Sequence, residues 1–275
     1  MKPFFSVIIS TLNEEKCLPI LLEDLNKQKT KDFELIVVDG GSSDKTVSVA
    51  NKNKNNFIKY KLIKSDKQNL SYQRNLGAQK SAGRFLIFLD ADIRIKTDYL
   101  STIKKVIEKK SFLFLTTYQY DDSDNLNKFL VQVTNYSLEL LKLIGKQMAP
   151  GYNFIILKEV FERLGGFNEK TTMSEDHDLS IRIQQAGVKI NIIPKQLLKW
   201  SFRRIKKDGY IPILFKYGIA TFHSLVLGEI TDKKLGYQMG GQYFIAEEEV
   251  KSNKKIQKEI KKYYSKITKA FNKIF

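Results

Sequence analysis

Two aspartates, Asp90 and Asp92, follow directly on the apolar run 85–89 and are separated by a single residue. Two carboxylates at this spacing can take a divalent cation, whose remaining positions are filled by waters and phosphate oxygens. Such an ion neutralises charge on a departing diphosphate. The same tripeptide also occurs by chance in turns, where its acids cap the next helix. Its position immediately after a strand-like run favours metal binding over a cap.

A second acid, Asp39, follows the apolar run 33–38 and is itself followed by Gly-Gly-Ser-Ser-Asp. The glycines permit a tight turn and a close approach of the backbone to a ligand, and the acid can accept hydrogen bonds from a base or a ribose. The segment lacks both the Gly-x-Gly-x-x-Gly fingerprint of dinucleotide binding and the lysine of a P-loop. Taken alone, it is equally consistent with a plain turn and a helix cap.

A third acidic group is the run Glu-Asp-His-Asp at 175–178. A carboxylate here is a candidate general base, but acids at this spacing also suit a helix N-terminus, where they offset the macrodipole. Without further motifs, the helix N-terminus is the favoured interpretation. His177, flanked by acids, is more typical of a surface residue than of a metal ligand.

The elements that must position these acids follow from the apolar pattern. Short apolar runs alternate with segments of helical spacing in the first half of the chain, which predicts βαβ units and a mostly parallel sheet. In such sheets ligands bind beyond the carboxyl ends of the strands, so the acids are expected along one edge. The predicted strands are 4–10, 33–38, 58–63, 85–89, 112–118, 153–157 and 189–193, and the predicted helices are 18–25, 44–52, 69–82, 125–145 and 176–186.

Composition indicates a folded protein with an anionic partner. The 275 residues are 42% hydrophobic, and the net charge of +17 suits a nucleotide, a phosphate, a nucleic acid or a membrane surface. The chain has a single cysteine, Cys17, which excludes an internal disulfide and fits a reducing compartment. It shows neither a secretory signal nor an apolar stretch of about 18 to 20 residues that could span a bilayer. The expected location is the cytoplasm.

In order along the chain, the motifs resemble glycosyltransferase family 2. They are Ser-Val-Ile-Ile-Ser-Thr-Leu-Asn-Glu at 6–14, Glu-Leu-Ile-Val-Val-Asp-Gly-Gly-Ser-Ser-Asp-Lys-Thr at 34–46, Arg-Asn-x-Gly at 74–77, Asp-Ala-Asp at 90–92, Gly-Gly-Phe-Asn-Glu at 165–169 and Ser-Glu-Asp-His-Asp-Leu at 174–179. The resemblance covers about residues 4–195. It implies the GT-A fold, a Rossmann-like α/β architecture with a mostly parallel sheet flanked by helices. It also implies an inverting transferase that uses a nucleotide-diphosphate sugar, usually a uridine one, with Mn²⁺ or Mg²⁺ as cofactor.

The resemblance also implies a role for each matching position. On the donor side, Thr11 and Glu14 would border the nucleoside, and Asp39 would bind the base. Arg74 would lie near the diphosphate, Asp90 would contact donor sugar and metal, and Asp92 would hold the metal. On the acceptor side, Glu175 would contact the acceptor, and Asp176 would be the general base. With these motifs present, Asp176 as base becomes the favoured interpretation of the acidic run. Downstream, Arg203 and Arg204 are candidate diphosphate ligands, with a solvated basic loop as the equal alternative.

The sequence indicates the acceptor less specifically than the donor. The Gln-x-x-Arg-Trp form of processive synthases is absent, which favours the addition of one sugar to a hydroxyl of a lipid-linked or cell-envelope glycan. A polyprenyl-phosphate sugar synthase is an alternative with the same fold. A nucleotidyltransferase is less favoured because 11–15 is not a glycine-rich basic loop. A nucleic-acid-binding protein is disfavoured because no zinc spacing or helix-turn-helix pattern is present.

The end of the chain differs from the rest. We expect a catalytic domain over 1–245, with a donor half about 1–95 and an acceptor half about 96–245, and a basic amphipathic helical tail over 246–275. Residues 251–275 hold nine lysines and one glutamate, a net charge of +8, with an apolar stripe at helical spacing. This pattern predicts a peripheral helix on an anionic membrane surface. A tail that packs on its own domain, or a solvated helix, is the alternative.

Overall fold

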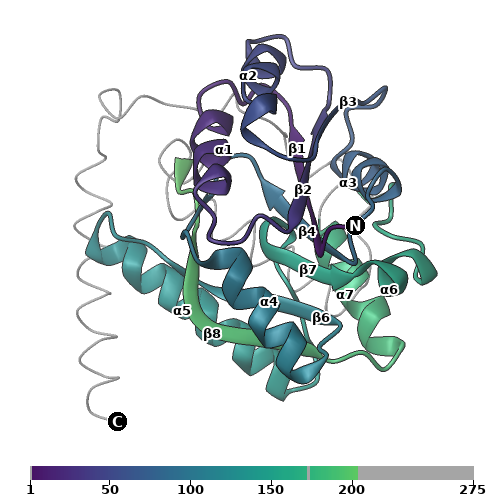
Figure 1. The fold of residues 1–275 in the computed structure, drawn as a ribbon. Helices are drawn as coiled ribbons and strands as arrows, with labels where there is room; N and C mark the ends of the chain where they lie inside the picture. Colours follow the sequence, from purple (N-terminus) through teal and green to yellow (C-terminus); the bar gives the residue numbers. More distant parts are fainter. Residues whose placement is uncertain (1, 172–173, 204–275) are drawn as a thin grey trace.

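The computed structural model describes residues 2–171 and 174–203. Within them, helices cover both faces of an eight-stranded sheet with the order β3-β2-β1-β4-β7-β6-β8-β5 (Figure 1). Residue 204 and everything after it, including Arg204 and the predicted tail 246–275, lie outside the described residues. The division into a catalytic domain and a tail therefore stays a prediction.

The first half of the sheet is parallel, as the sequence predicts. Strand β1 pairs in parallel with β2 on one side and with β4 on the other, and β2 pairs in parallel with β3. These strands are β1 (Phe5–Thr11), β2 (Phe33–Asp39), β3 (Tyr60–Lys64) and β4 (Phe85–Asp90). Because β1, β2 and β4 run side by side in the same direction, their carboxyl ends meet at one edge.

The second half of the sheet mixes directions. Strand β7 is antiparallel to both β4 and β6, β8 is parallel to β6, and the short β5 is antiparallel to β8. Their bounds are β5 (Arg94–Ile95), β6 (Phe114–Tyr120), β7 (Phe154–Leu157) and β8 (Ile190–Lys199). The predicted α/β architecture is confirmed. The three antiparallel pairings lie in the half where the sequence shows no regular alternation of strand and helix.

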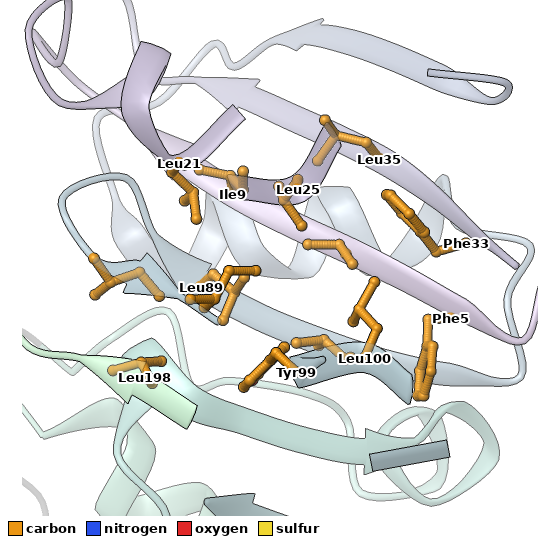
Figure 2. Packing of buried hydrophobic residues seen from close by; sticks show 14 of the residues in the cluster. Phe5, Ile9, Leu21, Leu25, Phe33, Leu35, Leu89, Tyr99, Leu100 and Leu198 are labelled. Carbon is orange, nitrogen blue, oxygen red and sulfur yellow. The ribbon is translucent and has the colours of Figure 1, made fainter. Parts of the chain in front are cut away.

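Two apolar layers enclose the sheet because successive strand residues point to opposite faces. On one face, Ile9 and Leu35 pack under Leu21 and Leu25 of α1 (Figure 2). On the other, Ile8 belongs to a separate cluster covered by helices later in the chain. The helices are α1 (Leu18–Asn26), α2 (Thr46–Lys52), α3 (Leu70–Gln79), α4 (Tyr99–Lys110), α5 (Asn125–Leu143), α6 (Lys158–Arg163) and α7 (Glu175–Gln185), with 3-10 turns η1 (Lys54–Asn56) and η2 (Gly151–Asn153).

The sequence prediction omits β5, α4 and α6. Helix α4 does carry a helical apolar pattern, since Tyr99, Leu100, Ile103 and Ile107 are all buried. Its intervening lysines obscure that stripe in the sequence. Strand β5 has only two residues and exists because β8 offers it an edge, which no local pattern reports. Among the described residues, no helix is both long and apolar enough to cross a membrane.

Candidate active site

The candidate site begins where β1 and β2 end side by side. The pairing register sets Thr11 opposite Asp39, and the Thr11 hydroxyl donates to Asp39 Oδ1 over 3.2 Å. The same carboxylate accepts from the Gly41 and Ser42 backbone nitrogens at 3.0 Å each, and from the Ser42 hydroxyl at 2.5 Å. Asp39 is buried, and these four bonds occupy both of its oxygens. Its visible role is therefore to shape the loop that would border a nucleoside.

Gln73, a residue that the sequence interpretation missed, connects the ends of β1 and β2. Its side-chain amide on α3 donates to the carbonyl oxygens of Thr11 and Val38, each 3.0 Å away. A β-carbon added at Gly40 would lie 2.9 Å from Gln73 Nε2, so the first glycine after Asp39 makes room for this amide. Gln73 adjoins the predicted Arg74, but nothing local in the sequence distinguishes it from a surface glutamine.

The loops after β1 and β2 are joined into one unit. The backbone nitrogen of Asn13, a residue with φ of 56°, donates to Ser42 Oγ. The next backbone nitrogen, of Glu14, donates to Thr46 Oγ1 over 2.7 Å. This arrangement explains why Ser42, Asp44 and Thr46 follow Asp39 so closely, because their side chains accept from the backbone nitrogens of the neighbouring loop. Asp44 Oδ1 also accepts from the Thr46 backbone nitrogen over 2.9 Å, so this acid supports the first residue of α2 as well, which begins at Thr46.

Arg203 brings the end of the described chain into this edge. Its two terminal nitrogens donate to the two carboxylate oxygens of Glu14 at 2.7 and 2.6 Å, and its Nε forms an ion pair with Asp92 Oδ2 at 2.8 Å. Burial raises the pKa of Glu14 to about 7, although the hydrogen bond and positive charge of Arg203 lower it. Arg203 therefore compensates two acids of the predicted donor side at once.

Arg74 makes a second bridge between acids. It lies fully within the protein and donates through Nη2 to Asp90 Oδ1 at 2.9 Å and through Nη1 to Glu175 Oε1 at 2.6 Å. Burial raises the pKa of Glu175, against the lowering effect of the Arg74 charge. A β-carbon at Gly151 would lie 2.8 Å from Arg74 Nη1, so a glycine is needed there for the guanidinium to fit. Arg74 thus connects the end of β4 to the start of α7.

Asp176 lies in the first turn of α7, next to Glu175. Its Oδ2 accepts from the Gly151 backbone nitrogen at 2.7 Å, and its Oδ1 from the His177 nitrogen at 2.9 Å. The acids of this run do open a helix, as the helix interpretation predicts, and the role of Asp176 as general base stays a prediction. The signal that could have pointed to Gly151 is the Pro-Gly dipeptide at 150–151, a strong turn marker.

Aromatic residues border the site beside these acids. The rings of Tyr152 and Trp200 stack with centroids 6.2 Å apart and an interplanar angle of 17°, and Trp200 also packs on Phe202. The Tyr152 hydroxyl donates to Gln119 Oε1 over 3.0 Å. An aromatic surface next to a candidate base is suited to an apolar or sugar-ring ligand. The sequence shows the aromatic residues but not that Trp200 meets Tyr152.

The donor set fits a hard divalent cation. Asp90 and Asp92 supply carboxylate oxygens, which Mg²⁺ and Mn²⁺ prefer, and Asp90 is about one third exposed at the rim of the sheet. Within 2–171 and 174–203 no three His, Cys, Asp or Glu side chains group as a metal cluster. The protein side of such a site would then be these two aspartates, with phosphate oxygens and waters completing the coordination.

The structure brings the predicted residues together in three linked groups. These are Thr11 with Asp39, Glu14 with Arg203 and Asp92, and Arg74 with Asp90, Glu175 and the neighbouring Asp176. Arg203 is thus an ordered ion-pair partner and not a solvated basic residue. The functional roles assigned to all these residues stay predictions.

Comparison with known proteins shows the family of this chain. A family model described as glycosyl transferase family 2 matches residues 6–165. A PGL/p-HBAD biosynthesis glycosyltransferase of Mycobacterium tuberculosis is 29% identical over 187 residues, which are 66% of this chain and 69% of that protein. An uncharacterized glycosyltransferase of Methanocaldococcus jannaschii is 26% identical over 230 residues, covering 82% of this chain and 79% of the relative.

Solved structures share the fold. The mannosyltransferase PcManGT from Pyrobaculum calidifontis, in complex with GDP-Man and Mn²⁺, superposes with a TM-score of 0.63 at 16% identity, covering 89% of this chain and 67% of that one. TarS 1–349 of S. aureus, in complex with UDP-GlcNAc, gives a TM-score of 0.60 at 22% identity. That match covers 73% of this chain but only 58% of the TarS chain. These likenesses show a GT-A type fold.

Proposed function

Because this chain belongs to glycosyl transferase family 2, we propose that it moves one sugar from a nucleotide-diphosphate sugar, with uridine as the nucleoside, to a hydroxyl of its acceptor. The observation that carries the proposal is the bridge made by Arg74. This buried guanidinium joins Asp90, on the predicted donor side, to Glu175, which adjoins the candidate base. The two carboxylates that would serve the donor and the acceptor are thereby joined in one hydrogen-bonded unit.

The residues proposed for the donor side would bind a nucleoside diphosphate through a cation and an arginine. A divalent cation held by Asp90 and Asp92 would stabilise the charge of the departing nucleoside diphosphate. The loops after β1 and β2 would border the nucleoside, with Asp39 shaping the loop through its four hydrogen bonds. Arg203 would bind phosphate oxygens in place of its present carboxylate partners, since a guanidinium binds them in pairs as it binds the Glu14 carboxylate here.

The acceptor side supplies a base. Asp176 would accept the proton of the acceptor hydroxyl while the acceptor oxygen bonds to the anomeric carbon, and the electron pair of the broken bond would leave with the diphosphate. An acceptor oxygen that attacks from the sugar face opposite the leaving group, where this base would lie, inverts the anomeric configuration, as the activated water of an inverting glycosidase does. The Gly151 N–H holds Asp176 Oδ2 at 2.7 Å, which restricts the rotation of the carboxylate. A polyprenyl phosphate acceptor is already ionised and would need no such base.

The acceptor is proposed to be a lipid-linked or cell-envelope glycan, reached at the cytoplasmic face of a membrane. The support is the net charge of +8 over residues 251–275, since each lysine near an anionic leaflet contributes about 1 kcal/mol. The stacked Tyr152 and Trp200 rings would receive the sugar or lipid portion of that acceptor.

A thermal-shift screen tests the donor proposal directly. Nucleoside diphosphates of uridine, guanosine and thymidine, and their sugars, are added with Mn²⁺ or with chelator. A ligand at 100 times its Kd adds about 2.7 kcal/mol to the folded state, so a uridine ligand with Mn²⁺ should raise the unfolding midpoint. Asp92→Asn should remove that rise. A midpoint that responds to duplex nucleic acid and to none of the nucleotides would support the nucleic-acid-binding alternative instead.

A further inference from the structure

Helix α5 carries an exposed apolar stripe that no part of the proposed reaction uses. Its members recur at three- and four-residue steps, so they lie on one face of the helix. Their exposed fractions run from 44% to 82%. The stripe consists of Val133, Tyr136, Leu140, Leu143 and Ile144. A contiguous apolar surface of this kind marks a binding site more often than scattered single residues do.

The opposite face of α5 is already committed to the protein core. Val131 and Leu138 are about 1% exposed, and Asn135 is buried between them. The Asn135 side chain accepts from the Gln119 backbone nitrogen and donates to its carbonyl oxygen, each over 2.9 Å. These contacts fix the rotation of the helix about its axis, so the stripe stays exposed unless another surface covers it.

The charges around the stripe select that surface. The exposed charged side chains of α5 and the turn after it are Lys128, Lys142 and Lys146, all positive. The one acid of the helix, Glu139, is half-buried and accepts a hydrogen bond from the Tyr118 hydroxyl. A cover of opposite charge is therefore favoured. The basic segment 251–275, with its net charge of +8, and a second copy of α5 would both bring like charges together.

We infer that α5 is an interfacial helix, whose stripe inserts into the headgroup region of an anionic lipid bilayer. An apolar face with an aromatic residue and neighbouring lysines is the pattern of such helices. The inference extends the proposed association of residues 251–275 to a second, folded element. It does not rest on sugar transfer, because lipid binding needs neither donor nor acceptor.

Helix α5 is connected to the candidate site by a series of hydrogen bonds. From the buried face of α5, Asn135 holds Gln119, whose side chain accepts the Tyr152 hydroxyl over 3.0 Å. The residue before Tyr152 is Gly151, which donates to Asp176. A bilayer on α5 is thus linked through one short series of contacts to the aromatic border and the candidate base.

Vesicle co-sedimentation of the full chain tests the inference. The variant is Leu140→Gln with Leu143→Gln, because glutamine keeps helix propensity while removing apolar surface. The matched control is Ile58→Gln, since Ile58 is 82% exposed, as Leu143 is, but lies elsewhere on the molecule. Vesicles of phosphatidylcholine with phosphatidylglycerol are compared with phosphatidylcholine alone, at low and at high salt.

The salt series separates charge from apolar insertion, and the double variant then removes apolar surface from α5 alone. High salt screens the lysines of α5 and of residues 251–275, so the binding that persists there reports apolar insertion. We expect the double variant to partition about tenfold more weakly at high salt, with Ile58→Gln unchanged. Equal partitioning of the double variant and the wild type would overturn the inference. So would a lowered unfolding midpoint or a changed oligomeric state of the variant without vesicles, because either would show that protein covers the stripe.

Discussion

The Nε atom of Arg203 lies 2.8 Å from Oδ2 of Asp92, so the last described residue of the chain neutralises a carboxylate that is predicted to hold metal. The same guanidinium binds both oxygens of Glu14. A cation at Asp92 and the side chain of Arg203 therefore compete for one negative charge. This relationship leads to opposite expectations for metal binding and for nucleotide binding when Arg203 is changed.

Arg203→Gln should tighten Mn²⁺ binding in the absence of nucleotide by about fivefold, the effect of losing one partly exposed ion pair. The same change should weaken binding of uridine diphosphate with Mn²⁺ present, because a phosphate ligand is lost. Electron paramagnetic resonance of free Mn²⁺ measures the first and calorimetry the second. Arg163→Gln removes the same charge from an exposed position on α6 and should alter neither. Unchanged Mn²⁺ affinity in Arg203→Gln would show that the two cations do not compete.

Asp176→Asn should leave donor affinity intact while transfer falls by about 10² to 10⁴-fold, since the amide keeps the shape but cannot accept the proton. Calorimetry with the donor and a transfer assay with a hydroxyl acceptor separate the two effects. Asp178→Asn, on the same helix but paired with Arg182, is the control and should keep transfer. If Asp176→Asn transfers sugar at the rate of the wild type, another group is the base.

Arg74→Met should lower the free energy of unfolding by about 3 to 5 kcal/mol, because it leaves Asp90 and Glu175 near each other without their shared cation. Urea unfolding measures the change. For comparison, Arg94→Met removes an arginine whose side chain is 48% exposed and should cost about 1 kcal/mol. Equal losses of unfolding free energy in the two variants would contradict the prediction that the buried Arg74 bridge stabilises the fold more than an exposed ion pair does.

Glu14 should make the protein less stable as the pH rises toward neutral. Its folded pKa of about 7 lies above the ordinary value of 4.5, so the folded state keeps the proton longer than the unfolded chain does. Stability from this group is complete below about pH 4.5 and is lost as the pH rises through 7. The full loss is roughly 3 kcal/mol at 1.36 kcal/mol per pH unit.

The comparison that isolates Glu14 is urea unfolding of the wild type and of Glu14→Gln between pH 4.5 and 8, with chelator present. Other groups contribute to both proteins, so only the difference in slope is used. The wild type should lose stability relative to the variant across this window. Parallel curves would show that Arg203 keeps Glu14 ionised throughout, and that its bidentate contact outweighs the effect of burial.

Residues 251–275 should bind anionic vesicles through charge. Replacing Lys261, Lys262, Lys266 and Lys269 with glutamine should weaken vesicle binding strongly at low salt and little at high salt, because each lysine contributes about 1 kcal/mol and is screened by ions. Co-sedimentation of the full chain measures both conditions. Binding that is unchanged at low salt would favour a tail that packs on its own domain.

Local pattern by itself determined much of this protein. The apolar runs and the helical spacing between them predict β1 to β4 and α1 to α3, because strands and helices bury residues with different periods. The position of Asp90 and Asp92 follows from the same pattern, since a carboxylate directly after a buried strand must lie at the rim of the sheet. The ordered motifs then suffice to recognise the family.

Tertiary structure alone decided which groups meet. Arg74 touches Asp90 and Glu175, and Arg203 touches Glu14 and Asp92, across long separations in the chain. Nothing in the sequence near an arginine states which acid it will face, because ion pairs depend on how the strands and helices are packed. The same holds for Gln73 beneath the loop of Asp39, for the antiparallel β7, and for the exposed face of α5. In α5 the periodicity shows a helix, but only its packing through Val131 and Asn135 decides which side remains open.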